Sequence, residues 1–152
     1  MFATCLTGCG GWTSDQFFHL PFPSGVLSRF ASIHQLEALA IVVGVRLWGP
    51  RWAGLRIQVY CDNAAVVSAL NSGRVRDPLL GVCLRELWFY VAVYDFELRA
   101  VHLASSTNRR ADLLSRWHLN DRYSADFFHD TADLSLMEAS VPNDIFQLSE
   151  LM

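Results

Sequence analysis

The chain contains no lysine: all 12 basic residues among its 152 are arginines. Arginine presents a planar fork of donors that binds phosphate groups in a bidentate manner, so a polyanionic partner is compatible with this composition. A solvated surface that simply uses arginine would have the same composition. The composition therefore leaves both interpretations open.

Basic residues are also missing from the C-terminal end. Residues 1–122 carry all 12 arginines against nine acidic residues, whereas residues 123–152 carry six acidic residues and no base. Hydrophobic periodicity fades beyond His118. We therefore expect a domain over residues 1–118 and an acidic tail or linker over residues 119–152 that contributes little to the core.

No hydrophobic run is long enough for a membrane. The longest apolar stretch, Ala38 to Val45, falls far short of the ~20 residues that a transmembrane helix needs. No basic segment and no small-residue cleavage site follow Met1, so we expect an intracellular protein without a signal peptide or a membrane partner. With 52% apolar residues, the chain is expected to bury a core of its own.

Cysteine is scarce, and the four cysteines lie in or beside apolar segments. They are expected to be reduced core residues rather than disulfides. Cys5 and Cys9 together with His19 could be zinc ligands, but no second pair with metal-ligand spacing follows them. Zinc is therefore the less favoured interpretation.

The stretch from Leu55 to Asn71 predicts a strand that runs directly into a helix. Apolar and polar side chains alternate up to Cys61, which is the period of a strand with two unlike faces. After Asn63 the apolar residues fall at helical spacing, and Gly73 supplies a stop. Asp62 thus stands where a strand ends and a helix begins, at the sheet edge where ligands usually bind. It could equally serve only as the cap of that helix.

The other segments predict an α/β fold around one sheet. The expected elements are two short strands in residues 1–12, a strand at 16–22, a helix from 32 to 48, a strand at 55–61, a helix from 64 to 72, a helix from 78 to 94, a strand at 96–103 and a helix from 109 to 117. The order is β-β-β-α-β-α-α-β-α, with a mixed central sheet of about five strands flanked by helices. A strand that begins at Met1 is very short, which suggests a truncated edge.

Two further acids stand near predicted helix starts. Glu37 follows a capping box formed by Ser32 and Gln35, and Asp112 lies in the first turn of the last helix. The helix dipole alone favours acids at such places. Together with Asp62 they form an oxygen-only ligand set that suits Mg²⁺. Two such ions about 3.5–4 Å apart can hold the attacking and leaving oxygens of a phosphodiester.

Four segments resemble the type-1 ribonuclease H fold, and more closely the ribonuclease H region of tyrosine-recombinase retrotransposons of the DIRS and Ngaro type. They are HQLEALAIVVGVRLWGP, VYCDNAAVVSALNSGRVRD, LRELWFYVAVYDFELRAVH and NRRADLLSRW, and CLTGCGGW resembles the first hairpin of the family. The resemblance implies a ribonuclease H-like fold within a retroelement reverse transcriptase polyprotein. It also implies cleavage of the RNA strand of RNA–DNA hybrids by two Mg²⁺ ions.

The resemblance assigns roles to individual residues. Glu37, Asp62 and Asp112 match catalytic, metal-binding acids of the family, and His102 matches an auxiliary position in the loop before the last motif. The implied substrate contacts are Asn63, Asn71, Arg74, Asn108 and Arg109.

Ala3 stands where the family has its first aspartate, the acid that bridges both metal ions. Asp15, beyond the glycine turn, is a poor substitute. We therefore expect the second Mg²⁺ to bind weakly and cleavage to be impaired. The alternative is a catalytically inactive remnant that still binds nucleic acid.

A phosphatase of the haloacid dehalogenase type is a third interpretation, because it also places an aspartate at the end of a buried strand. That chemistry requires a second aspartate two residues later, and residue 64 is alanine. This interpretation is the least favoured.

Overall fold

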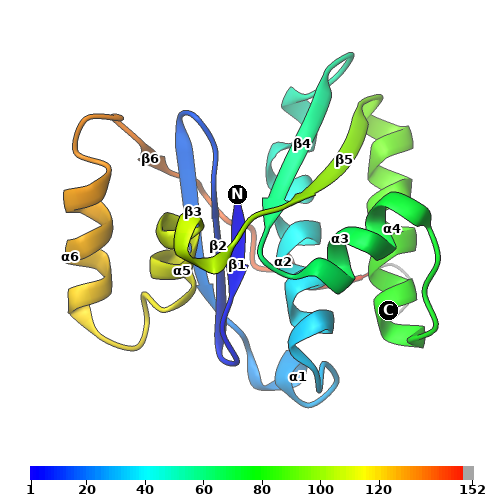
Figure 1. Cartoon of the computed structure of the whole chain (residues 1–152), viewed down its shortest axis with the longest axis horizontal. Helices are drawn as coiled ribbons and strands as arrows, with labels where there is room; N and C mark the ends of the chain where they lie inside the picture. The colour runs from blue at the N-terminus through cyan, green and yellow to red at the C-terminus, as the bar shows by residue number, and fades with distance from the viewer. Residues whose placement is uncertain (149–152) are drawn as a thin grey trace.

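Two small sheets form the centre of the structure, a computed structural model that describes residues 1–148 (Figure 1). The first sheet contains β1 (Phe2–Thr4), β2 (Gly8–Trp12), β3 (Gln16–Pro21) and β6 (Met137–Glu138), in the order β1-β2-β3-β6. β6 runs parallel to β3, and the other pairs are antiparallel. The second sheet pairs β4 (Arg56–Cys61) in parallel with β5 (Glu97–His102).

Helices cover both faces of the first sheet. In Figure 1, α5 and α6 lie on one side of β1–β3, α2 lies on the other, and α4 lies beyond α2. The helices are α1 (Ser24–Leu27), α2 (Ile33–Trp48), α3 (Ala64–Ser72), α4 (Pro78–Tyr94), α5 (Arg109–Ser115) and α6 (Asp121–Asp130), with short 3₁₀ segments at Gly49–Arg51 and Ser105–Thr107.

The predicted α/β class with a mixed sheet is confirmed. The expectation of one sheet of about five strands is not met, because the strands form separate sheets of four and two. β1 is only three residues long, and no ladder joins it to β4 within residues 1–148.

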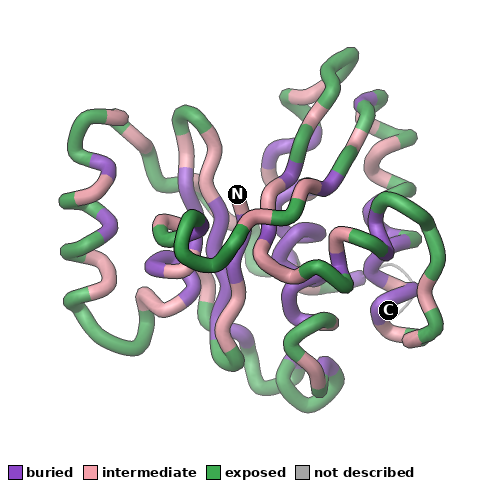
Figure 2. The backbone as a smooth tube through the Cα atoms, in the orientation of Figure 1, coloured by how far each residue is buried: buried purple, intermediate pink, exposed green. Residues whose placement is uncertain are grey.

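α2 is the central element of the core. Its predicted capping box is present: the Ser32 hydroxyl accepts from the Gln35 N–H, and the Gln35 side chain accepts from the Ser32 N–H. All residues from Leu36 to Val45 are buried, and Figure 2 shows this burial continuing into β1 and β2. The helix approaches β1 so closely that a side chain at Gly44 would overlap the ring of Phe2. Because the middle of α2 is enclosed on both sides, Glu37 is buried together with its apolar neighbours.

The strand-to-helix unit around Asp62 forms largely as predicted. β4 ends at Cys61. Gly73 caps the C-terminus of α3, and its φ of 71° lies in the left-handed region that favours glycine. The cap of α3 is Asn63, whose side-chain oxygen accepts from the Val66 N–H. Asp62 is therefore not the helix cap, and its carboxylate is available for other contacts.

The expectation that residues 119–152 contribute little to the core is wrong for the described part of this segment. Phe127 is fully buried, and Ile145 and Leu148 belong to the main core. The Nη1 atom of Arg46 lies 3.0, 2.6 and 2.9 Å from the carbonyl oxygens of residues 144, 145 and 147. The segment docks because scattered apolar residues face inward while its acids remain outside.

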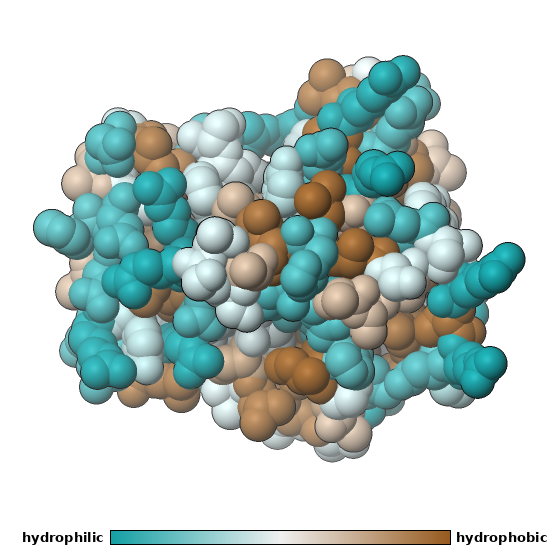
Figure 3. Space-filling view, viewed as in Figure 1, coloured by the Kyte–Doolittle hydropathy of each residue, from teal (hydrophilic) through white to brown (hydrophobic). Residues whose placement is uncertain are grey.

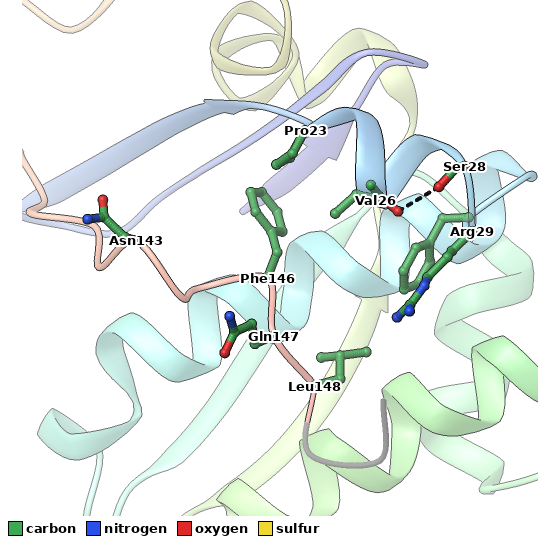
Figure 4. A pocket seen from close by; sticks show the side chains of 10 residues that line it. Pro23, Val26, Ser28, Arg29, Asn143, Phe146, Gln147 and Leu148 are labelled. Carbon is green, nitrogen blue, oxygen red and sulfur yellow. Dashed lines mark hydrogen bonds between the residues drawn. The ribbon is translucent and has the colours of Figure 1, made fainter. Parts of the chain in front are cut away.

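Two views show how this segment meets the body. The surface over α6, at the left of Figure 3, is mostly hydrophilic. Phe146 and Leu148 line a cavity of about 490 Å³ with Pro23, Val26 and Arg29 from the α1 region (Figure 4). This cavity is bounded by α1 and the C-terminal segment.

Membrane and disulfide expectations can be compared with the described residues. No helix within residues 1–148 has both the length and the apolar character to cross a bilayer. Cys9, Cys61 and Cys83 are buried free thiols, and Cys5 is a half-buried one, as expected for reduced cysteines.

Phe127→Ala should lower the free energy of unfolding by about 3–5 kcal/mol, because it empties a fully buried site between β3 and α5. The neighbouring Phe128, with an exposed fraction of 54%, supplies the matched control. Phe128→Ala should cost roughly 1 kcal/mol, the scale of its exposed aromatic contacts. Urea denaturation measures both, and equal losses would contradict the docking of α6.

Candidate functional site

Glu37 is a carboxylic acid inside the core. Its exposed fraction is 2%, and its Oε1 atom has no hydrogen-bond partner. Burial and, to a smaller extent, the negative charge of Asp62 raise the pKa of Glu37 to about 8. An acid in this environment is stable when it holds a proton or meets a cation.

Asp62 directly follows the last residue of β4 and is half-buried. Its Oδ2 atom accepts a 3.0 Å hydrogen bond from the Ser105 hydroxyl, which belongs to the short 3₁₀ segment after β5. This bond connects the carboxyl end of β4 with the loop that leads to α5. Because the charge of Asp62 contributes to the raised pKa of Glu37, the structure brings these two acids into one neighbourhood.

Asp112 lies in the first turn of α5, and its carboxylate contacts an arginine rather than Glu37 or Asp62. Its Oδ1 atom lies 3.2 Å from Nε of Arg116, one turn later in the same helix. Asn108 anchors the start of this helix to β1, because its Nδ2 donates to the Phe2 carbonyl at 2.8 Å. No group of three or more acidic, histidine or cysteine side chains in residues 1–148 has a metal-holding arrangement. The convergence of all three acids on one metal site stays a prediction.

Ala3 lies in the strand between these acids. It pairs with Gly10, where a side chain would collide with Leu114 of α5. Cross-strand partners share a face of a sheet, so the Ala3 methyl group points to the α5 side. Phe2 packs against α2, and alternation along the strand puts Thr4 on that same side. Residue 3 is therefore directed toward the helix of Asp112, whereas Glu37 lies on the opposite face of β1.

Buried polar atoms without a partner occur on both sides of β1. Of four buried side-chain nitrogen or oxygen atoms without a partner in the described residues, three are Thr4 Oγ1, Glu37 Oε1 and Asn108 Oδ1. Folded proteins rarely leave such atoms unsatisfied, and the exceptions concentrate where an ion, a water or a ligand belongs. Three acceptor-capable oxygens around β1 are a feature that sequence reasoning did not predict. The sequence singled out Glu37 as a metal-binding acid and Asn108 as a substrate contact, and it gave no signal for Thr4.

The predicted substrate-binding asparagines are engaged within the fold. Asn63 caps α3, and its Nδ2 lies 2.8 Å from Nδ1 of His34. Asn71 bonds to both the N–H and the carbonyl of Ala100 in β5, at 2.9 and 2.8 Å. These contacts hold the elements around Asp62 in place.

The remaining predicted residues are exposed. Arg74 lies in the loop between α3 and α4, and His102 ends β5. Arg109 is paired with the acidic helix α6: its Nε lies 2.8 Å from Asp130 Oδ2, and its Nη2 lies 3.8 Å from Asp126 Oδ2. A nucleic acid would therefore compete with α6 for Arg109.

No family model, curated protein or solved structure matches this chain.

The pKa of Glu37 predicts how stability changes with pH. Above about pH 4.5 the unfolded chain releases a proton that the folded protein keeps until about pH 8, so the contribution of Glu37 to stability should fall as the pH rises through this window. The Met1 amino group acts in the opposite sense, because burial lowers its pKa to about 5. Glu37→Gln should remove this contribution, so that stability rises with pH over the window, and it should raise the free energy of unfolding at pH 8 by a few kcal/mol.

Denaturant titrations at pH 5 and pH 8 measure this difference. The exposed Glu97 provides the matched control, because Glu97→Gln should leave the pH profile unchanged. A Glu37→Gln profile with the same pH dependence as that of the unmodified protein would show that Glu37 does not contribute to it.

Proposed function

We propose that residues 1–118 form a ribonuclease H-like domain from a retroelement reverse transcriptase polyprotein, with weakened Mg²⁺-dependent cleavage of RNA–DNA hybrids. The observation that carries the proposal is Glu37, a buried acid with an unpaired oxygen in the neighbourhood of Asp62. The order of elements through α5 also supports it, since three strands, a long helix, and then β4, α3, α4, β5 and α5 follow one another as the resemblance implies.

The residues fit one magnesium ion better than two. Mg²⁺ takes a few carboxylate oxygens at about 2.1 Å and keeps several waters, so Glu37 and Asp62 could hold one ion. When bound, such an ion polarises a phosphodiester and supports the attack of water on it. Asp112 is engaged with Arg116 and would have to exchange that contact to join the site. Ser105 would hold the Asp62 carboxylate in place through their hydrogen bond.

The alanine at residue 3 is the reason to expect that cleavage is weak. Residue 3 lies in β1 and is directed toward the helix of Asp112, so an acid at this place would join Asp112 in a second metal position. A methyl group supplies neither a ligand nor a negative charge there. Binding of the second ion, and with it stabilisation of both the attacking and the leaving oxygen, should then be weak.

The second candidate function is binding of nucleic acid without turnover. It is favoured by Ala3 and by the exposure of Arg74 in the loop that follows α3. Both candidates involve contact with phosphates and 2′-hydroxyl groups rather than readout of base sequence. Cleavage of the RNA strand separates the two.

Restoring an acid at residue 3 tests the catalytic candidate. Ala3→Asp should raise Mg²⁺-dependent cleavage of an end-labelled RNA–DNA hybrid at least tenfold, and Asp62→Asn in the same background should abolish the gain. Ala3→Asn is the matched control, since it has nearly the same shape without the charge. Efficient cleavage by the natural sequence, or a folded Ala3→Asp variant that remains inactive, would contradict the role assigned to residue 3.

Phosphate binding predicts a steep salt dependence. Affinity for a hybrid should fall as salt rises, and Arg74→Ala should reduce the slope of log K against log salt by about one. Arg51→Ala is the control, because Arg51 is already paired with Asp15 at 2.7 Å. Fluorescence anisotropy with two unrelated hybrid sequences measures both effects. Binding to one sequence alone, or binding that ignores salt, would contradict this interface.

A further inference from the structure

The cavity between α1 and the C-terminal segment has the size of a small-molecule site. Its volume of about 490 Å³ lies within the range of roughly 300–1,000 Å³ that is usual for such sites. It shares no lining residue with the proposed magnesium site around Glu37 and Asp62. A ligand in this cavity would therefore be independent of any cleavage of nucleic acid.

The walls of the cavity are mostly apolar. Val26, Phe30 and Leu148 are buried members of the hydrophobic core, and each turns part of its surface to the cavity. Pro23 and Phe146 add further apolar surface, and in Figure 4 the ring of Phe146 points toward Pro23. Such walls favour the hydrocarbon part of a ligand, because its burial removes apolar surface from water.

Internal contacts hold both walls in place without a ligand. Arg46 binds backbone carbonyls on both sides of Phe146, which fixes the C-terminal segment at this point. The ring of Phe146 also packs edge-on against Phe22, with the ring centroids 5.8 Å apart. On the other side, the N–H of Arg29 donates to the carbonyl of Val26 at 3.0 Å. A cavity with fixed walls pays little conformational entropy when a ligand binds.

One cation stands among these apolar walls. Arg29 lines the cavity, and in Figure 4 its guanidinium group points toward Leu148. Within residues 1–148 this guanidinium takes part in no hydrogen bond, ion pair or ring contact. The described lining residues include no aspartate or glutamate. The cavity therefore combines a single positive charge with N–H donors that no described residue uses.

A hydrophobic monocarboxylate matches these features. A guanidinium group binds a carboxylate through two parallel hydrogen bonds. One arginine balances the single charge of a carboxylate, whereas a phosphate monoester would keep up to about one further negative charge beside apolar walls. An uncharged ligand would leave the donors of Arg29 unused. A flexible aliphatic chain can follow walls that come from two separate segments of the protein.

We propose that this cavity binds a small monocarboxylate with an aliphatic body, such as a medium-chain fatty acid. The carboxylate pairs with the guanidinium group of Arg29. The hydrocarbon chain lies against Val26, Phe146 and Leu148. The site does not depend on the proposed function, because none of these residues takes part in it.

Titration of the full chain with decanoate tests the proposal, with 1-decanol as the matched ligand that lacks the charge. The measurement is the change in amide NMR shifts, with both ligands below the concentrations at which they aggregate. Decanoate should shift the amides of Val26, Phe30 and Leu148, and it should bind roughly tenfold or more tightly than decanol. Equal affinities, or shifts spread evenly over the protein, would overturn the proposal.

Three variants assign the binding to the residues of the cavity. Arg29→Gln should weaken decanoate binding by roughly tenfold or more and leave decanol binding unchanged. Phe146→Ala should weaken the binding of both ligands. Arg51→Gln is the control, because Arg51 is paired with Asp15 at 2.7 Å and does not line the cavity. A folded Arg29→Gln variant that binds decanoate as well as the unmodified protein would contradict the site.

Two further ligands distinguish other sources of an anionic group. Decyl phosphate should bind no more tightly than decanoate, and clearly tighter binding would assign the cavity to phosphate esters instead. The peptide acetyl-Val-Leu-Phe with a free carboxylate represents the C-terminus of another protein. Binding of this peptide without binding of decanoate would assign the cavity to a peptide partner and overturn the proposal. The proposal is also overturned if none of the ligands shifts the amides of the cavity.

Discussion

The structure depends on the burial of α2 between the first sheet and α4. A helix enclosed in this way can form only if nearly all of its residues are apolar, and Leu36 to Val45 meet this condition except at Glu37. A carboxyl group in such a place opposes folding whenever it is ionised. Its presence is explained physically if the site also receives a cation. For this reason the proposed cation site is centred on Glu37 rather than on the more exposed acids.

The elements around Glu37 are arranged so that their ends meet. Asn63 caps α3 and leaves Asp62 free to accept from Ser105, which ties β4 to the loop before α5. Asn108 bonds to the β1 backbone and so fixes the start of the helix that carries Asp112. Short-range bonds from amide and hydroxyl side chains thus set the positions of the acids. The same bonds account for two of the asparagines that the sequence suggested as substrate contacts.

Local signals predicted the elements well. The capping box of Ser32 and Gln35 located the start of α2, and the structure has α4 at Pro78–Tyr94 as expected. The choice between Asp62 and Asn63 as a cap could not be made from sequence, since both residue types cap helices equally well. Only the backbone geometry at the end of β4 decides it.

Long-range features were not predictable in the same way. The C-terminal segment docks partly through Arg46, which bonds to backbone carbonyls and so recognises no particular side chains. Phe127 was hidden among the acids of α6, whose overall composition suggested a solvated tail. The separation of β1 from β4 depends on how far each strand extends, which residue patterns locate poorly. The unpaired oxygen of Glu37 follows from packing and has no sequence signal.

The most direct test of the central claim is thermal unfolding at pH 8 with and without MgCl₂, at equal ionic strength. If Glu37 and Asp62 hold Mg²⁺, the ion should raise the melting temperature, and a concentration 100-fold above Kd should add about 2.7 kcal/mol of stability. Glu37→Gln and Asp62→Asn should each abolish this Mg²⁺-dependent rise, while the exposed Asp133→Asn should retain it. An equal rise in all four proteins, or none in the unmodified protein, would contradict a cation site at Glu37.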